Sequence, residues 1–408
     1  MWCTTSMKML TPENRSDFKY LLKLLSSVIN DTQPEKPNGK TDWASVFSFA
    51  ECHSVAGMTS YAVQKLPDEY KPSQEIMDKF IEAQRCELIL ESNIQFETDC
   101  IISYLNERKI TVMLLKGMIL KHYYPVSSMR TMSDVDLLYK PEDKKMIQKA
   151  FDNMGYKLTL DFSHELHYNK PPFYHYEVHP SLVTEDKFSY DYFKDVWSKA
   201  VVNESGYTCL NLEDTYIYMM EHLAKHIEKS GAGIRMLMDV YVFLRKEKDT
   251  LNFEYIEKEF EKLRLNDFAR KITELAFNWF ENSDPDTEST VADYLLSSST
   301  FGTVRNAILQ NNIRKEQKTG KKQNGIKYLL SKLFPTHSHI CGRFPKAKGR
   351  KALYPFYLIG YWYLRFFKDK NVNTSNIGNY FAKTDSEEGR IIMDAINDLG
   401  LSQRIKKD

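Results

Sequence analysis

The sequence predicts an α+β protein in which a small core containing strands lies between two helical regions. Three observations support this fold class. Apolar residues recur every three or four positions through most of the first 108 residues, as in helices. Short apolar or alternating runs then indicate strands, and helical spacing returns from about residue 191. We therefore expect an N-terminal helical region over 1–109, an α/β core over 110–185 and a larger C-terminal helical region over 186–408.

The N-terminal region is predicted from three segments with helical spacing, at residues 12–30, 42–57 and 73–108. The polar stretch 30–40 contains Pro, Asn and Gly, so we expect it to be a loop. Asp42 immediately precedes the second segment and has a side chain suited to an N-cap.

The core is predicted from a change in apolar spacing. Strands are expected over 111–115, 133–139 and 156–162, followed by a strand pair over 165–183. Gly117 ends the first strand, and a short helix is expected over 118–124. Pro141 is placed as the first-turn residue of a second helix.

The C-terminal region is predicted from helical spacing over 212–229, 234–247, 253–264 and 267–280. Residues 314–325 are polar and contain Gly, so we expect a connection there. The whole chain has a net charge of +1, but residues 314–370 contain fifteen Lys or Arg and two acidic residues. The basic segment 314–351 is interpreted first as a solvated linker. Binding of nucleic acid or another polyanion is the less favoured alternative.

The sequence favours a cytoplasmic protein. Its six cysteines are scattered without a CxxC pair, and there is neither an apolar leader segment nor an apolar run long enough for a transmembrane helix. The aromatic run 353–367 is predicted to be a buried helix. Because basic residues precede it, a peripheral membrane contact through 343–367 is the alternative interpretation.

Two aspartates in the second predicted strand indicate a metal site. Asp134 and Asp136 are two residues apart, so in a strand both side chains project from the same face. Two carboxylates at one place repel each other, and a divalent cation removes this penalty. Mg²⁺ prefers oxygen ligands and commonly binds carboxylates together with substrate phosphates. The pair therefore suits a metal-dependent reaction on a phosphate ester.

A third acidic residue and several phosphate-binding groups are expected nearby. Glu177, in the predicted strand pair, is the candidate third carboxylate, although it could instead pair with a Lys or Arg on an exposed strand face. Glycine allows a backbone to approach a ligand closely at a helix start, which makes the turn at Lys116 and Gly117 a candidate phosphate site. Arg130 and Ser133 are further candidates for nucleotide binding.

Histidines offer alternative interpretations. His222 and His226 have the spacing of a helical zinc pair, but the glutamate of an HExxH motif is missing. Arg235 and Asp239 have the spacing of a helix salt bridge. Alternatively, the wall of a cleft could be formed by His179, His222, His226, Arg235 and Asp239. A transition-metal site is a further alternative at the cluster His164, His167, His175 and His179.

The motif "LLKG…YYP…R…SDVDLL" followed by "YEVH" resembles an uncharacterised bacterial family within the polymerase-β-type nucleotidyltransferase superfamily. The resemblance covers about residues 43–245 and implies a mixed-sheet core. It implies that Asp134, Asp136 and Glu177 are catalytic metal ligands and that Gly117 is the phosphate-turn glycine, with Lys116 beside it. Lys116-Gly117-Met118 stands where the superfamily usually has Gly-Ser or Gly-Gly.

The function implied is transfer of a nucleoside monophosphate from an NTP, such as ATP, to an unidentified acceptor (an activity of EC 2.7.7 type) with Mg²⁺ or Mn²⁺. The alternative is a catalytically inactive nucleotidyltransferase fold that binds a nucleotide or a protein.

Overall fold

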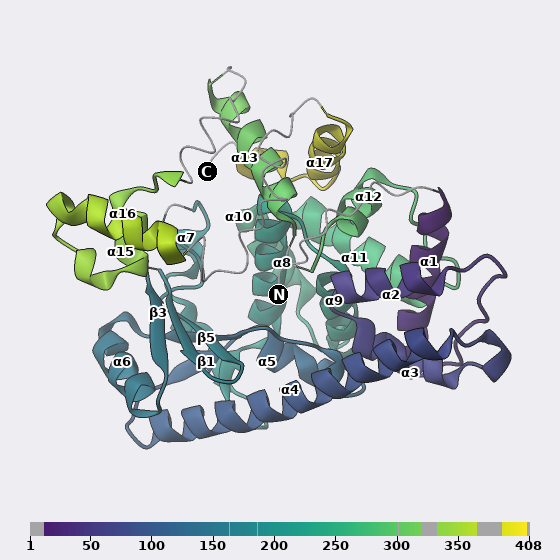
Figure 1. Ribbon diagram of the computed structural model, residues 1–408, viewed down its shortest axis with the longest axis horizontal. Coiled ribbons are helices and arrows are strands. Elements are labelled where there is room, and N and C mark those ends of the chain that lie inside the picture. Colours follow the sequence, from purple (N-terminus) through teal and green to yellow (C-terminus); the bar gives the residue numbers. More distant parts are fainter. Residues whose placement is uncertain are drawn as a thin grey trace.

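A five-stranded sheet lies at one end of a body that is otherwise mainly helical (Figure 1). The structure is a computed structural model that describes residues 12–162, 164–185, 187–300, 302–319, 333–364 and 386–405. The predicted α+β class is confirmed, with a mixed sheet and helices around it.

The sheet has the strand order β1-β2-β5-β4-β3. Its strands are β1 (Val112–Leu114), β2 (Val135–Tyr139), β3 (Lys157–Asp161), β4 (Leu166–Lys170) and β5 (Tyr174–His179). The β2–β5 pair is parallel, whereas β1–β2, β4–β5 and β3–β4 are antiparallel. The parallel pairing places Asp136 directly opposite Glu177.

The sheet is covered unequally. β2 is buried along its whole length, as expected for a strand packed on both faces. In β4 and β5, burial alternates: Leu166, Tyr168, Tyr176 and Val178 lie in the core, whereas the residues between them are less buried. The apolar face packs on α4 and α6. The opposite face of β4 and β5 is therefore the polar face of the sheet.

Helices before the sheet are α1 (Pro12–Ile29), α2 (Trp43–Cys52), α3 (Ala56–Lys65) and α4 (Gln74–Asn106), with the 3₁₀ turn η1 (Asp68–Tyr70). Asp42 caps α2 as predicted, because its Oδ1 accepts a hydrogen bond from the backbone N–H of Ala44 at 2.9 Å. The helix predicted over 42–57 is interrupted, since Ser54 has a φ of 55° between α2 and α3.

Short elements connect the strands: α5 (Gly117–Leu120), η2 (Lys121–Tyr123), η3 (Ser127–Met129), η4 (Pro141–Asp143) and α6 (Lys144–Asn153). The later helices are α7 (Tyr190–Phe193), α8 (Leu212–Lys229), α9 (Ile234–Glu247), α10 (Phe253–Leu263), α11 (Asn266–Glu281), α12 (Thr290–Ser297), α13 (Val304–Thr319), α15 (His337–Arg343), α16 (Tyr354–Tyr363), α17 (Glu387–Asp398) and α18 (Ser402–Ile405). The 3₁₀ turns among them are η5 (Val196–Lys199), η6 (Pro345–Ala347) and η7 (Lys351–Leu353).

Two expectations for the C-terminal region need correction. A hairpin of β6 (Ala200–Val202) and β7 (Thr208–Leu210) lies within the stretch expected to be helical. Gly206 has a φ of 79° in the turn between these strands, a conformation that favours glycine. The connection predicted over 314–325 is also partly wrong, because α13 continues to Thr319. The rest of that stretch lies outside the described residues.

The aromatic run forms α16, which is buried on one side only. Leu358 and Tyr361 are buried, whereas Phe356 and Ile359 are 71% and 61% exposed. The expectation of a buried helix is therefore half right, and residues 365–367 lie outside the described part of the chain. Within the described residues, no helix has the length and apolarity needed to cross a membrane.

Candidate active site

The turn after β1 has an unusual backbone. Lys116 has φ 46° and ψ −112°, a combination that is costly for a residue with a side chain. Gly117 follows as the first residue of α5 and lies close against two side chains. A Cβ there would lie 2.6 Å from Sδ of Met132 and 2.7 Å from Nη1 of Arg130. The glycine thus permits close packing, while the strain falls on Lys116.

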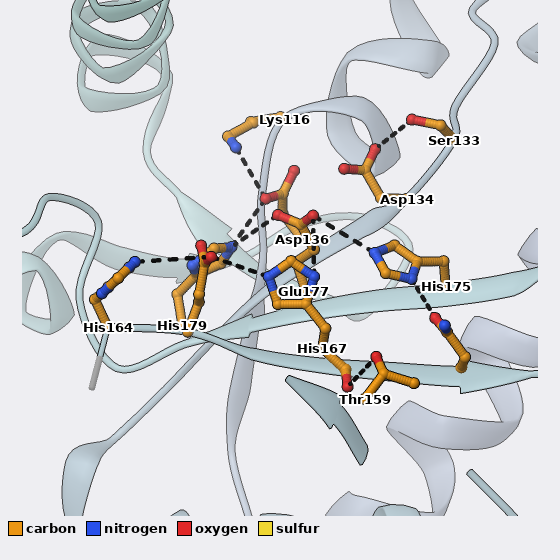
Figure 2. Close-up of polar contacts among 12 residues, drawn as sticks. Lys116, Ser133, Asp134, Asp136, Thr159, His164, His167, His175, Glu177 and His179 are labelled. Carbon is orange, nitrogen blue, oxygen red and sulfur yellow. Dashed lines mark hydrogen bonds and ion pairs between the residues drawn. The ribbon is translucent and has the colours of Figure 1, made fainter. Parts of the chain in front are cut away.

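Lys116 points at Asp136, as Figure 2 shows. Its Nζ donates a hydrogen bond to Oδ1 of Asp136 at 2.9 Å. Nε2 of His179 lies 3.1 Å from the same oxygen. Burial alone would raise the pKa of Asp136, but Lys116 and His179 lower this pKa well below its usual value. Burial opposes the charge on Lys116, yet Asp136 raises the pKa of the ammonium group. Both groups are therefore charged.

Glu177 lies on the polar face of the sheet among histidines. Its Oε1 is 3.6 Å from Nδ1 of His167 and 3.5 Å from Nε2 of His175, and its Oε2 is 3.9 Å from Nε2 of His179. Burial tends to raise the pKa of Glu177, but His175 and the other imidazoles lower it, against the opposing charge of Asp136. The carboxylate is therefore ionised beside Asp136.

Asp134 lies just before β2, so it does not have the strand geometry assumed for the predicted pair. Its Oδ1 accepts a hydrogen bond from Oγ of Ser133 at 2.8 Å. Burial raises the pKa of Asp134, and the negative charges of Asp136 and Glu177 raise it further. Three carboxylates are therefore near enough to destabilise one another, which is the condition that a bound cation would relieve.

The donor atoms fit a divalent cation. One oxygen each from Asp136 and Glu177 and a nitrogen of His179 lie within 4.8 Å of one another. A second such group within the described residues is formed by His167, His175 and Glu177, and Asp134 belongs to neither. Carboxylate oxygens suit Mg²⁺ or Mn²⁺, and imidazole nitrogen is the ligand of transition metals.

Helix α8 places two histidines near Lys116. The Nε2 atoms of His222 and His226 are 3.1 Å apart. Burial and then the charge of Lys116 lower the pKa of both rings, that of His226 to about 3. Tyr218 continues this row one helical turn earlier, with its ring centroid 6.1 Å from that of His222.

Arg130 and Asp239 form a buried ion pair. Nε and Nη2 of Arg130 donate to the two oxygens of Asp239 at 3.2 and 2.8 Å, and the hydroxyl of Tyr124 donates at 2.8 Å. Arg235 donates to the backbone oxygen and the hydroxyl of Thr131, both at 2.9 Å. Asp239 thus pairs with Arg130, which is 109 positions away in the sequence, rather than simply with Arg235 on the same helix. The guanidinium group of Arg130 is correspondingly held by Asp239.

Two residues near the site had not been singled out from the sequence. Glu165 lies 3.0 Å from Nε2 of His167 through its Oε1, and Tyr218 packs beside His222. The i,i+4 spacing of Tyr218 with His222 was a usable signal. No such signal marks Glu165, because its position beside His167 depends on how β3 and β4 pair.

A mixed sheet with carboxylates on neighbouring strands is the arrangement expected of a nucleotidyltransferase. The profile of a family described as uncharacterised nucleotidyltransferase matches residues 39–281, and the chain belongs to this family. Among solved structures, it is similar to the antibiotic-resistance factor ANT(2'')-Ia, with 11% identity and a TM-score of 0.34 over 43% of this chain and 92% of that one. The comparison with curated proteins gave no match.

Proposed function

We propose that this protein transfers a nucleoside monophosphate from an NTP to an acceptor hydroxyl in a reaction that requires Mg²⁺ or Mn²⁺. The observation that carries the proposal is the meeting of Asp136 and Glu177 at one register position of the parallel β2–β5 pair. Lys116 contacts Asp136 from the neighbouring turn, so positive and negative groups meet at one place. Family membership supports the same class of reaction.

Asp136 and Glu177 would hold the cation, with Asp134 as the third carboxylate beside them. A cation bound there would neutralise the phosphates of the NTP and lower the pKa of the acceptor hydroxyl. Asp136 is ionised over the whole physiological range because Lys116 and His179 lower its pKa. It is therefore ready to bind a cation without first losing a proton.

Lys116 would attract the triphosphate. Its ammonium group is a compact positive charge, and the Asp136 contact holds it at the edge of the carboxylate cluster. Gly117 directly follows Lys116, and Ser133 directly precedes Asp134. The contribution of the chain is then mainly positioning and electrostatic stabilisation of charge that develops on the phosphates.

Arg130, Arg235 and Asp239 would hold the turn at Gly117 and the loop at Thr131 in position. Arg130 packs against the position of Gly117, and Arg235 holds the loop at Thr131. His222 and His226 would form the neutral wall of the nucleotide site, because their lowered pKa values keep both rings uncharged at neutral pH.

A binding protein without chemistry is the second candidate. The observation in its favour is that Oδ1 of Asp136 is already contacted by both Lys116 and His179, which together balance its charge. In that case the chain would bind an NTP, or a partner protein, without turnover.

Release of pyrophosphate tests the proposal. Full-length protein is incubated with each NTP, with Mg²⁺ or Mn²⁺, and with pools of small molecules, RNA and protein as acceptors. We expect pyrophosphate and a labelled acceptor from the wild type, and a decrease of about 100-fold or more in Asp136→Asn and Glu177→Gln. Asp284→Asn is the matched control, since Asp284 is 77% exposed and pairs with Lys19.

Two results would contradict nucleotidyl transfer. One is equal pyrophosphate release from the wild type and Asp136→Asn. The other is tight NTP binding by both proteins with no turnover in any acceptor pool, which would favour the binding protein.

A further inference from the structure

A second group of metal-ligand atoms lies beside Asp136 on the polar face of the sheet (Figure 2). It consists of Nδ1 of His167, Nε2 of His175 and Oε1 of Glu177, which are within 4.8 Å of one another. His167 is directly opposite Glu177 in the antiparallel β4–β5 pair. His175 is two residues before Glu177 on β5 and so projects from the same face. Strand pairing alone therefore brings the three side chains together.

Each imidazole has a partner on its other nitrogen. Nδ1 of His175 contacts Oδ1 of Asn169, its cross-strand neighbour. Nε2 of His167 lies 3.0 Å from Oε1 of Glu165. Histidines that bind metals usually have such an oxygen partner on the second nitrogen, which fixes the tautomer and the ring orientation.

These outer contacts leave the inner nitrogens facing a negative charge. Because Oδ1 of Asn169 accepts, it favours a ring proton on Nδ1 of His175. In this tautomer of a neutral His175, the lone pair of Nε2 faces Oε1 of Glu177 at 3.5 Å. Lone pairs and a carboxylate repel one another unless a cation or additional protons lie between them.

We propose that His167, His175 and Glu177 bind a transition-metal dication, of the Zn²⁺, Co²⁺ or Mn²⁺ class, at a position separate from the cation beside Asp136. Two imidazoles and one carboxylate are the donors that such ions prefer, whereas Mg²⁺ prefers oxygen. Glu177 would join the two positions, because its Oε1 faces His167 and His175 while its Oε2 faces His179. The inference rests on the proposed function only through this shared carboxylate.

Cobalt binding tests the site without any need for activity. Full-length protein is treated with a chelator and then titrated with Co²⁺, followed by visible absorption, and with Zn²⁺, followed by calorimetry. We expect one tightly bound ion per chain. The affinity should fall by about 10- to 100-fold in Glu165→Ala, which removes the oxygen beside Nε2 of His167, and by more in His167→Ala and His175→Ala.

Further variants locate the ion. His122→Ala is the matched control, because His122 is exposed and lies in η2 outside the cluster. His175→Asp keeps a ligand and should retain Co²⁺ with a changed spectrum, which separates lost coordination from a misfolded chain. Asp136→Asn should abolish pyrophosphate release but keep the Co²⁺ spectrum. A wild-type protein that gives this spectrum but releases no pyrophosphate with any NTP or acceptor would sustain the metal site and reject the proposed function.

Three outcomes would overturn the metal site. The first is a lack of stoichiometric Co²⁺ or Zn²⁺ binding by the wild type, which would mean that protons rather than a metal balance Glu177. The second is binding that survives both His167→Ala and His175→Ala. The third is binding lost in the double variant His222→Ala/His226→Ala and kept in His175→Ala, which would assign the ion to α8.

Discussion

The carboxylate cluster of the sheet and the Arg130–Asp239 pair contain the same kinds of charged residue but differ in how their charges are balanced. Arg130 contacts both oxygens of Asp239, and Tyr124 adds a third hydrogen bond, so opposite charges are matched. Around Asp136, by contrast, Asp134 and Glu177 add negative charge, and the pKa of Asp134 is raised as a result of its burial and of these neighbours. Matched charges stabilise the fold at Asp239, whereas the unmatched negative charge around Asp136 is the condition that the proposed cation site requires.

The largest expected effect on stability comes from breaking the matched pair. Arg130→Leu leaves Asp239 buried without its main partner, which should lower the free energy of unfolding by about 3–5 kcal/mol. Urea denaturation followed by circular dichroism measures this change. The double variant Arg130→Met/Asp239→Leu removes both charges and should recover much of the loss. A loss below about 1 kcal/mol in Arg130→Leu would show that the Arg130–Asp239 pair does not stabilise the fold as a matched buried pair.

The next effect concerns the strained backbone at Lys116. Lys116→Ala and Lys116→Gly both remove the ammonium group, but glycine adopts the observed dihedral angles more easily. The glycine variant should therefore be about 1–3 kcal/mol more stable than the alanine variant by thermal or urea unfolding, while both lose NTP binding. Lys109 also has a positive φ, of 59°, and lies outside the site, so Lys109→Ala and Lys109→Gly are the matched controls, which should keep NTP binding. Equal stability of the two Lys116 variants would mean that the turn carries no strain.

A smaller effect should appear in the titration of α8. The pKa of His226 is lowered from 6.5 to about 3 by burial and then by Lys116. Because the folded-state pKa lies below the unfolded one, the stabilising contribution is complete above pH 6.5 and decreases as the pH falls toward 3. Lys116→Met should raise the pKa of His226, as measured by NMR titration of the ring. His226→Gln should reduce the acid-side loss of stability. An unchanged titration in Lys116→Met would place Lys116 too far from α8 to act on it.

The smallest effect is expected on the exposed side of α16. Ile359→Ser should change the free energy of unfolding by less than about 0.5 kcal/mol, because Ile359 is 61% exposed. If this helix contacts membranes, the same variant should weaken co-sedimentation with anionic vesicles. Equal sedimentation of variant and wild type would remove the membrane interpretation of 343–367.

Local rules predicted much of the fold but less of the geometry around Asp136. Apolar spacing placed the strands, and the cap at Asp42 was found from its residue type. The contact between His179 and Asp136 depends on the register of β2 with β5, which joins residues 43 positions apart. Arg130 and Asp239 are 109 positions apart, so spacing along one helix suggested a different partner. The break at Ser54 and the start of β2 at Val135, later than predicted, likewise did not follow from residue type.

Helix α4 belongs to the two larger hydrophobic cores of the protein. Its 33 residues extend about 50 Å. Phe80 near its start packs in the core of the helical body, and Ile101 and Leu105 near its end pack beneath the sheet. Between them, Leu88 and Ile89 are exposed. The unbroken helix thus joins the core of the helical body to the underside of the sheet, so a break at its exposed middle would remove this connection.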